Sequence, residues 1–375
     1  MTIFSIIILV IGLYIFILGI SNVIFLKTKE IKQAPTKGPL VSVLIPARNE
    51  EHHIGDLLIS LVNQDYENYE ILVIDDNSTD KTWEVIQGFV TKYPFITGYK
   101  GKPKVLKVNG KTYALSQIEV LAKGEILLST DADTVHAPNS ISTAVALLKN
   151  NELDLGSGFP QEACPSFLGS CCINAMNFAV VAYIPLAIVY KHPSPFFTLA
   201  NGQLMVMNKE KLHSIGGYER ICEKLTDDVT LAKHFVKEKK RYSLLPIASF
   251  IKCNMYTSYK EAFWGITRSI GGIFPANLWI LPPILIIVAA LLTIAFSPLI
   301  AILFGIYGLY TECLLTAIGC LLFTISWYSN SRRQEFSRLV SFCWPLTVIL
   351  LCSMYFASYF TRMKGKTFTW KDREV

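Results

Sequence analysis

The stretch Glu125-Ile-Leu-Leu-Ser-Thr-Asp-Ala-Asp133 joins a short apolar run to two acidic residues. Residues 126–128 are typical of a strand buried inside a parallel sheet. Side chains two positions apart on a strand project to the same side, so Asp131 and Asp133 can point together from its carboxyl end. Open α/β sheets bind ligands at this edge. Two carboxylates there suit a divalent cation that also holds diphosphate oxygens, and the alternative is an Asp-rich turn without a ligand.

Strand and helix patterns alternate before this stretch. Apolar runs predict strands at 41–45, 71–74 and 96–99, and apolar residues at helical spacing predict helices at 52–63, 82–90 and 114–122. This alternation predicts an α/β domain with a doubly wound parallel sheet, whose nucleotide-sized crevice lies beyond the strand ends. The sequence has neither a G-x-G-x-x-G nor a Walker A motif, which disfavours dinucleotide and P-loop sites.

Apolar residues are concentrated at the two ends of the chain. Hydrophobic residues make up 51% of the 375 residues and charged residues 17%, with a mean hydropathy of +0.39. Residues 3–26 form one apolar run, long enough to span hydrocarbon and without the basic start of a removable signal peptide. Most of 277–360 is equally apolar. The composition therefore predicts a globular domain between membrane segments.

Basic residues place this domain and its partners. Four lysines follow the first apolar run, at positions 27, 29, 32 and 37. The positive-inside rule then predicts a multi-pass protein of the cell membrane with the domain in the cytoplasm. The net charge of +6 suits anionic lipid head groups. No basic stripe interleaved with aromatic residues suggests a nucleic-acid partner.

The carboxyl-terminal third contains three candidate spans, at 277–296, 299–325 and 339–360. Three complete spans would put the basic residues after 361 outside the cell, against the positive-inside rule, so one segment is expected to be re-entrant or interfacial. Glu312 is expected to face protein or to mark a break, because a carboxylate is costly in lipid. The segment 167–190 is expected to rest on the bilayer, and a buried helix pair is the alternative. All nine cysteines are interpreted as structural.

Two further groups follow predicted strands and precede helices. Asp75 and Asp76 end the second strand, where a carboxylate can accept hydrogen bonds from a base N–H or a ribose hydroxyl. Their alternative role is turn formation and helix capping. Lys111 follows Gly110, a pairing that brings a positive charge and a closely approaching backbone to a phosphate. Its alternative is a solvated loop lysine.

The order of the motifs resembles family-2 glycosyltransferases of the GT-A fold. The resemblance covers about residues 40 to 245 and rests on Pro46-Ala-Arg-Asn-Glu50, Asp75-Asp-Asn-Ser-Thr-Asp80, Gly110-Lys111, Asp131-Ala-Asp133, Asn201-Gly-Gln203, Gly216-Gly-Tyr218 and Thr226-Asp-Asp-Val229. Within the family, the membrane flanks and the closing Trp370-Lys-Asp-Arg373 are most similar to the bacterial carotenoid (diaponeurosporenoate) glycosyltransferase subgroup.

This resemblance implies a UDP-sugar donor and roles for the residues that bind it. Asp76, beside Asp75, would contact the base. Pro46, Arg48 and Glu50 would line the nucleotide. Lys111 would contact phosphate. The resemblance further implies that Asp131 lies near the ribose and, with Asp133, at a bound Mg²⁺ or Mn²⁺.

The resemblance also implies an acceptor side to the site. Asp228 would be the catalytic base, and Asp227 stands where the family has Glu, so no role is assigned to it. Gly202 and Gln203, with Asn201, would shape the floor of the acceptor site. A base on the side of the sugar opposite the leaving diphosphate implies inversion at the anomeric carbon. Taken alone, the pair of acids is more typical of a helix cap.

The segment around Arg268 favours the addition of a single sugar. Processive synthases of the family carry Gln-x-x-Arg-Trp, whereas this chain has Ile266-Thr-Arg268-Ser269. Arg268 is expected either at the diphosphate or at the membrane interface. Without the tryptophan, we expect transfer of one sugar to a lipid-like or other apolar acceptor such as a carotenoid. Polyprenyl phosphates and glycerolipids are the alternative acceptors, and a non-catalytic nucleotide-sugar-binding scaffold is the alternative outside the enzyme class.

The expected organisation has six segments. They are an N-terminal membrane helix at 1–26, a linker at 27–39, the GT-A domain at 40–260, an interfacial segment at 261–276, C-terminal membrane helices at 277–361 and a basic tail at 362–375.

Overall fold

The computed structural model describes residues 1–103, 108–176, 180, 183–222, 227–271, 281–364, 369–370 and 373–374. The chain divides into two compact units. The sheet unit comprises residues 26–162 and 186–254, and the helical unit comprises 1–25, 163–185 and 255–375. Each unit is described by itself.

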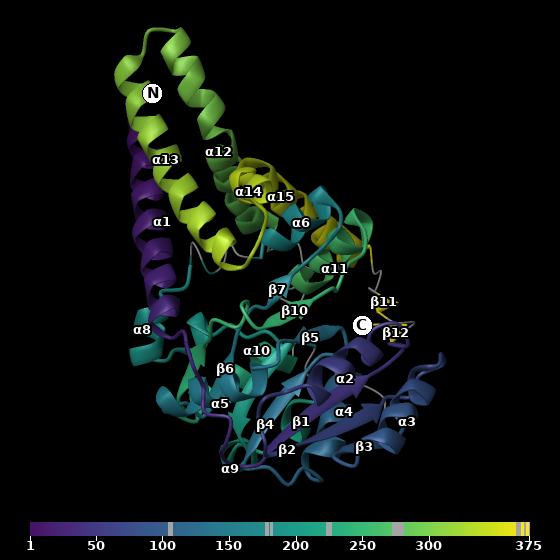
Figure 1. Ribbon diagram of the computed structural model, residues 1–375. Helices are drawn as coiled ribbons and strands as arrows, with labels where there is room; N and C mark the ends of the chain where they lie inside the picture. Colours follow the sequence, from purple (N-terminus) through teal and green to yellow (C-terminus); the bar gives the residue numbers. More distant parts are fainter. Residues whose placement is uncertain are drawn as a thin grey trace. The chain divides into compact units, whose positions relative to one another are not determined.

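The sheet unit is built on a seven-stranded sheet in the order β3-β2-β1-β4-β8-β6-β9 (Figure 1). Its strands are β1 (Val41–Ala47), β2 (Tyr69–Asp75), β3 (Ile96–Lys100), β4 (Ile126–Thr130), β6 (Leu155–Ser157), β8 (Leu204–Asn208) and β9 (Tyr242–Leu244). The four strands from β3 to β4 are parallel, as the alternating pattern predicts. Buried residues of β1, β2, β4 and the helix Ile54–Val62 belong to one continuous apolar core.

The expectation of a wholly parallel sheet is wrong at β8. This strand pairs antiparallel with both β4 and β6. Thr130, the last residue of β4, is the register partner of Leu204, the first residue of β8. An antiparallel neighbour begins where β4 ends, so the loop before β8 reaches the same sheet edge as Asp131. The direction of β8 is set by this long-range pairing, so it cannot be predicted from the pattern of apolar residues.

Helices cover this sheet and connect its strands. They are α2 (Ile54–Val62), α3 (Thr82–Lys92), α4 (Gly110–Glu119), α5 (Ser140–Asn150), α8 (Leu186–Lys191), α9 (Lys209–Ser214), α10 (Asp227–Lys237) and the 3₁₀ helices η1 (Pro195–Phe197) and η2 (Glu219–Ile221). Helix α4 begins four residues earlier than expected. Asn109 caps it, because its side-chain oxygen accepts a hydrogen bond from the Thr112 N–H at 3.3 Å. The cap places Lys111 in the first turn.

A second, three-stranded sheet lies in the same unit. It contains β5 (Thr134–His136), β10 (Ile251–Cys253) and β7 (Gln161–Glu162) in the order β5-β10-β7. Cys253 is the register partner of Thr134 on one side and of Glu162 on the other. The pairing therefore aligns Glu162 and Cys253 with the residue that follows Asp133.

The helical unit contains the long apolar helices. Its elements are α1 (Thr2–Thr28, whose last residues enter the sheet unit), α6 (Phe167–Asn174), α11 (Tyr259–Gly271), α12 (Leu281–Ile306), α13 (Tyr310–Arg333), α14 (Arg338–Phe342), α15 (Trp344–Met363), β11 (Thr369–Trp370) and β12 (Arg373–Glu374). Four helices within the described ranges, α1, α12, α13 and α15, are long and apolar enough to cross a membrane.

Small and polar residues hold α1 against α13. A Cβ added to Gly12 would lie 2.4 Å from the backbone oxygen of Gly319, so the two helices touch through their backbones. Ser326 Oγ donates to the Ile15 carbonyl at 2.9 Å, and Asn330 Nδ2 donates to the Gly19 carbonyl at 3.1 Å. Close backbone approach combined with interhelical hydrogen bonds is how helices associate where lipid removes the hydrophobic driving force.

The predicted position of the break between the first two C-terminal spans, at 297–298, is wrong. Helix α12 continues through Pro298 to Ile306, and the chain turns at Gly308, whose φ is +75°. Proline has no N–H for the Ile294 carbonyl, but Ser297 Oγ donates to that carbonyl at 2.7 Å. Glu312 consequently lies in the first turn of α13, where it accepts a hydrogen bond from Thr2 Oγ1 at 2.7 Å.

Candidate active site

The ends of β1 and β2 are joined through Arg48 and Asp76. The Asp76 N–H donates to the Ala47 carbonyl, and Arg48 Nη1 donates to the Asp76 carbonyl, both at 2.8 Å. Asp75 is buried, and one of its carboxylate oxygens accepts from the Ser78 N–H at 3.1 Å. Asp75 thus forms the turn after β2, the alternative weighed from the sequence. Pro46 lies on β1 opposite Ile74 of β2.

Glu50 supports the loop that follows β1. Its N–H donates to Thr82 Oγ1 at 2.7 Å, and its carboxylate lies 3.1 Å from the ring nitrogen Nδ1 of His53. Asn49 adopts a left-handed backbone conformation with φ of 50°. Its amide oxygen accepts from the Thr79 N–H at 2.9 Å. The predicted nucleotide loop is therefore fastened at several points to the loop after β2.

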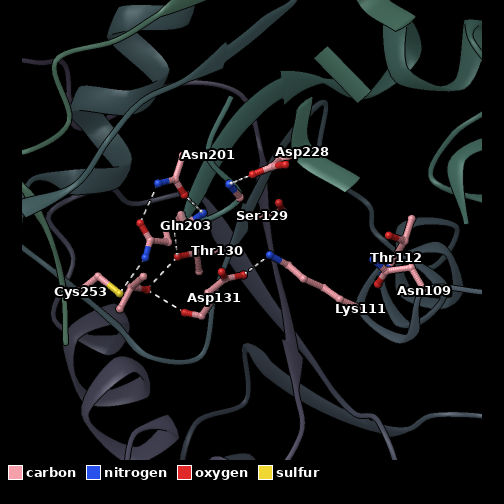
Figure 2. Close-up of polar contacts among 12 residues, drawn as sticks. Asn109, Lys111, Thr112, Ser129, Thr130, Asp131, Asn201, Gln203, Asp228 and Cys253 are labelled. Carbon is pink, nitrogen blue, oxygen red and sulfur yellow. Dashed lines mark hydrogen bonds and ion pairs between the residues drawn. The ribbon is translucent and has the colours of Figure 1, made fainter. Parts of the chain in front are cut away.

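Lys111 and Asp131 form an ion pair at the carboxyl end of β4 (Figure 2). Lys111 Nζ lies 2.5 Å from Asp131 Oδ1, and the two side chains are 20% and 23% exposed. The helix N-terminus of α4 and the end of β4 thus bring a cation and a carboxylate together. Partial exposure leaves both groups within reach of a ligand.

Asp228 lies in the first turn of α10 and faces the loop before β8. Its Oδ2 accepts from the Gly202 N–H at 3.0 Å, and its Oδ1 accepts from the Val229 N–H at 2.7 Å. A Cβ on Gly202 would lie 2.7 Å from Lys111 Nζ and 3.8 Å from Asp228 Oδ2. Lys111 of α4 and Asp228 of α10 therefore both approach Gly202, in the loop before β8. Figure 2 shows the side chains of Lys111, Asp131 and Asp228. Thr226 lies outside the described residues.

Gln203 is fully engaged by its neighbours. Its N–H donates to Asn201 Oδ1, and its Oε1 accepts from Asn201 Nδ2, both at 2.9 Å. Its Nε2 donates to Cys253 Sγ at 2.9 Å, and the side chain is buried. This network holds the shape of the loop that carries the Gly202 N–H. The role of Gln203 in the floor of an acceptor site stays a prediction.

An unpredicted carboxyl group, Glu162, lies near Asp133. Burial and the negative charge of Asp133 raise the pKa of Glu162 to about 7. Burial, followed by the same two carboxylates, raises the pKa of the Cys253 thiol well above its ordinary value. These shifts indicate a negative potential around Asp133, the setting that a cation would neutralise. Only the β7–β10–β5 pairing brings Glu162 here, so its local sequence carried no signal.

His136 was also missed by sequence reasoning. Its Nε2 lies 3.0 Å from Thr130 Oγ1, its Nδ1 lies 2.9 Å from Ser140 Oγ, and burial lowers its pKa to about 3. Thr130 Oγ1 also donates to the Gln203 carbonyl at 2.8 Å. The neutral imidazole thus braces the end of β4 against the loop before β8. A signal existed in the sequence, since His136 follows Asp133 by three residues.

The donor set fits a hard divalent cation only in part. Asp131 and Asp133 offer the carboxylate oxygens that Mg²⁺ and Mn²⁺ prefer. Within the part of the chain that the structure describes, no group of three or more His, Cys, Asp or Glu side chains could hold a metal ion. A cation here would therefore need oxygens from a diphosphate or water, and it would share Asp131 with Lys111.

Two other predicted features of the site, the motif Gly216-Gly-Tyr218 and Arg268, differ in outcome. Gly216 and Gly217 have φ of 97° and 64°, and a Cβ on Gly217 would lie 2.8 Å from Glu119 Oε1. This turn lets Tyr218 donate its N–H to Glu119 Oε2 at 2.8 Å and its hydroxyl to Ser129 Oγ at 3.2 Å, behind β4. Arg268 belongs to the helical unit, on α11, so its contact with a diphosphate stays a prediction.

Sequence comparison supplies relatives for this arrangement. Residues 42–162 match the family described as Glycosyl transferase family 2. A beta-monoglucosyldiacylglycerol synthase from Nostoc sp. is 28% identical over 286 residues, which are 71% of this chain and 55% of that protein. A dolichol-phosphate mannosyltransferase from Pyrococcus furiosus is 34% identical over 32% of this chain and 33% of that protein. The chain thus spans about half the length of the first of these relatives.

A solved structure supports the fold. The mannosyltransferase from Pyrobaculum calidifontis, in complex with GDP-Man and Mn²⁺, superposes with a TM-score of 0.50 at 18% identity. The similarity covers 95% of both chains. At this level of identity the comparison establishes the shared GT-A fold alone.

Proposed function

We propose that the chain transfers a single sugar from a UDP-sugar to a lipid acceptor at a membrane, from the premise that residues 42–162 match the family described as Glycosyl transferase family 2. The observation that carries the proposal is that Lys111, which pairs with Asp131 at 2.5 Å, lies beside Gly202, whose N–H donates to Asp228 at 3.0 Å. Lys111 and Asp131 would serve the leaving diphosphate, and Asp228 would receive the proton of the acceptor hydroxyl.

The donor would lie at the edge formed by the ends of β1, β2 and β4. Asp76 and Arg48 are linked through the Asp76 carbonyl at 2.8 Å, which supports their assignment to the nucleoside part of the donor. Pro46 and Glu50 belong to the same loop, on either side of Arg48. Asp75 forms the turn after β2, so it would affect donor binding only by positioning Asp76. The similar mannosyltransferase structure contains a nucleotide sugar, GDP-Man, which supports this donor class.

The diphosphate would lie between Lys111 and the two carboxylates after β4. Asp131 and Asp133 would hold Mg²⁺ or Mn²⁺, the second of which is present in the similar mannosyltransferase structure. Such an ion supplies neutralisation of the charge that develops on the leaving diphosphate. Lys111 would move from Asp131 to a phosphate oxygen, adding positive charge as a point cation. Arg268 is the further candidate for the diphosphate.

Asp228 would remove the proton from the attacking acceptor hydroxyl. Two backbone N–H groups hold its carboxylate, that of Gly202 at 3.0 Å and that of Val229 at 2.7 Å. These bonds fix the direction of its remaining lone pairs, which is what a general base needs. Attack from the face opposite the diphosphate would invert the anomeric configuration. Gln203 and Asn201 would form the floor beneath the acceptor.

A lipid acceptor is supported by the four apolar helices and by the relatives' names. A glycerolipid is favoured by the beta-monoglucosyldiacylglycerol synthases, and a polyprenyl phosphate by the dolichol-phosphate mannosyltransferase. A carotenoid is favoured by the resemblance of the membrane flanks and the carboxyl terminus. We propose a cell-membrane enzyme whose 40–260 domain faces the cytoplasm, anchored by residues 1–26 and 277–361.

The test is turnover by the full chain in lipid nanodiscs. Labelled UDP-sugars are supplied with diacylglycerol, a carotenoid carboxylic acid or a polyprenyl phosphate, with Mg²⁺, Mn²⁺ or a chelator. The proposal predicts one labelled, chromatographically mobile lipid carrying a single sugar, and loss of product in chelator. Nucleotide binding with no UDP release under any of these conditions would show a non-catalytic scaffold. Long products would show a processive synthase.

A further inference from the structure

The segment that contains α8 and η1 exposes apolar side chains. Ile188 on α8 is 60% exposed and Phe196 on η1 is 85% exposed. The rings of Phe196 and Phe197 form a T-shaped pair with centroids 5.0 Å apart, and Phe197 is half-buried. Large apolar side chains exposed close together on a surface mark interaction sites. We call residues 186–197 the α8–η1 surface.

A contact with the residue that follows α1 indicates the level of this surface relative to a membrane. Lys29 is the residue that follows α1, and its Nζ lies 3.8 Å from the ring centroid of Tyr190 on α8. Lys29 Nζ also donates to Asn151 Oδ1 at 2.5 Å, and the Tyr190 hydroxyl donates to the Asn151 carbonyl at 3.2 Å. Where α1 crosses a membrane, its last residue lies at the lipid–water boundary. Tyr190 must then lie at the same level.

Basic residues flank the α8–η1 surface, and one of them pairs with an acidic residue. Lys191 ends α8 and is exposed. Arg241 is 60% exposed, forms an ion pair with Glu152, and immediately precedes β9, the strand against which α8 packs. Lys29 is the third basic residue. Anionic head groups attract basic residues that lie near the membrane surface. This surface combines exposed apolar side chains, a tyrosine and flanking cations, which is the composition of an element that lies at a membrane interface.

We propose that the α8–η1 surface docks on the anionic head groups of the bilayer, with Phe196 and Ile188 inserted at the head-group boundary. The docking does not depend on catalysis, but it has a consequence for the candidate site. Asn201 follows Phe196 by five residues, so the loop before β8 starts at most about 18 Å from the docked aromatic residue. Helix α10, which carries Asp228, packs against η1. The bilayer would therefore meet the acceptor side of the site.

The experiment replaces Phe196 in the full chain with the photo-crosslinking residue p-benzoylphenylalanine. The matched control carries the same residue at Val120, an exposed apolar position of the sheet unit that is 69% exposed. Both proteins are placed in nanodiscs of phosphatidylcholine with or without phosphatidylglycerol, irradiated, and analysed for lipid adducts by mass spectrometry. Retention in the membrane is not the readout, because the long helices anchor every variant. Unchanged thermal unfolding shows that both variants are folded.

Docking predicts on the order of tenfold more lipid adduct at position 196 than at 120, as expected for a residue within the head-group boundary. Replacing both Lys191 and Arg241 with Gln should lower the adduct at 196 in phosphatidylglycerol discs and leave it unchanged in phosphatidylcholine. Equal adduct at 196 and 120 overturns the proposal. A large adduct at 196 that changes neither with the anionic lipid nor with the two substitutions overturns the proposed role of anionic head groups. Neither result bears on sugar transfer, which is measured separately.

Discussion

The backbone N–H of Gly202 donates a hydrogen bond of 3.0 Å to Oδ2 of Asp228. This bond joins the loop before β8 to the first turn of α10. The antiparallel pairing of β8 with β4 starts at Thr130 and Leu204, so the same loop also lies beside Asp131. One glycine therefore touches both halves of the candidate site.

Replacing Gly202 with Ala should impair the site without unfolding the protein. The added Cβ would lie 2.7 Å from Lys111 Nζ, and the lysine, as a flexible side chain, would move away from Asp131. We expect about a tenfold loss of kcat/KM with the melting temperature nearly unchanged. Gly88→Ala is the control, because a Cβ there meets nothing within 4 Å. Equal activity of the two variants would contradict the close approach at Gly202.

Lys111→Gln should weaken donor binding. The substitution removes the cation that lies 2.5 Å from Asp131 and that we assign to the diphosphate. Charge-assisted bonds are about twice as strong as neutral ones, so the Kd for UDP should rise on the order of tenfold. Isothermal titration calorimetry measures it, with exposed Lys123→Gln as the control. An unchanged Kd would show that Lys111 serves only to neutralise Asp131.

Acid should destabilise the sheet unit through His136. Burial lowers the pKa of this imidazole from 6.5 to about 3, so it stays neutral in the folded protein but binds a proton once unfolded below pH 6.5. Folding stability is therefore complete above pH 6.5 and falls toward pH 3, by up to about 1.4 kcal/mol per pH unit. Thermal unfolding in detergent between pH 7 and pH 4 measures the slope. His136→Gln, although less stable at pH 7, should show a flatter slope, and an equal slope would contradict this origin.

Gly12→Ala should loosen the packing of α1 on α13. Its Cβ would lie 2.4 Å from the Gly319 carbonyl oxygen, a backbone atom that cannot rotate away. Overpacking of this kind costs about 1–3 kcal/mol. Gly305→Ala is the control, because the nearest atom to its Cβ is Cys313 Sγ at 3.4 Å. The melting temperatures of the two variants in the same detergent provide the comparison, and equal values would refute the contact.

Local patterns predicted the first half of the sheet unit well. The apolar runs at 41–45 and 71–74 became β1 and β2, and the helical spacing at 82–90 became most of α3. These elements are buried on simple periodic faces, so their periodicity is visible in the chain. The order of Asp76, Asp131 and Asp228 pointed to one sheet edge. In the structure Asp228 accepts a hydrogen bond from the Gly202 N–H, and Asp131 pairs with Lys111, which also approaches Gly202.

Features that depend on distant partners were not predictable. Glu162 lies near Asp133 only because β7 and β5 both pair with β10. The hydroxyl of Ser297 donates to the Ile294 carbonyl, which Pro298 leaves without its backbone donor, so the helix continues past the predicted end of the first span at 296. The direction of β8 likewise follows from its two neighbours, β4 and β6, and not from its own residues.

The most direct measurement of the central claim separates nucleotide binding from chemistry in Asp228→Asn. The asparagine keeps an oxygen for the Gly202 N–H but cannot accept a proton at neutral pH. The account predicts sugar transfer lower by about 10²–10⁴-fold, with the Kd for UDP within about twofold of the unaltered protein, and no such loss in the exposed control Asp56→Asn. Transfer at the unaltered rate by Asp228→Asn, with the same product, would contradict it.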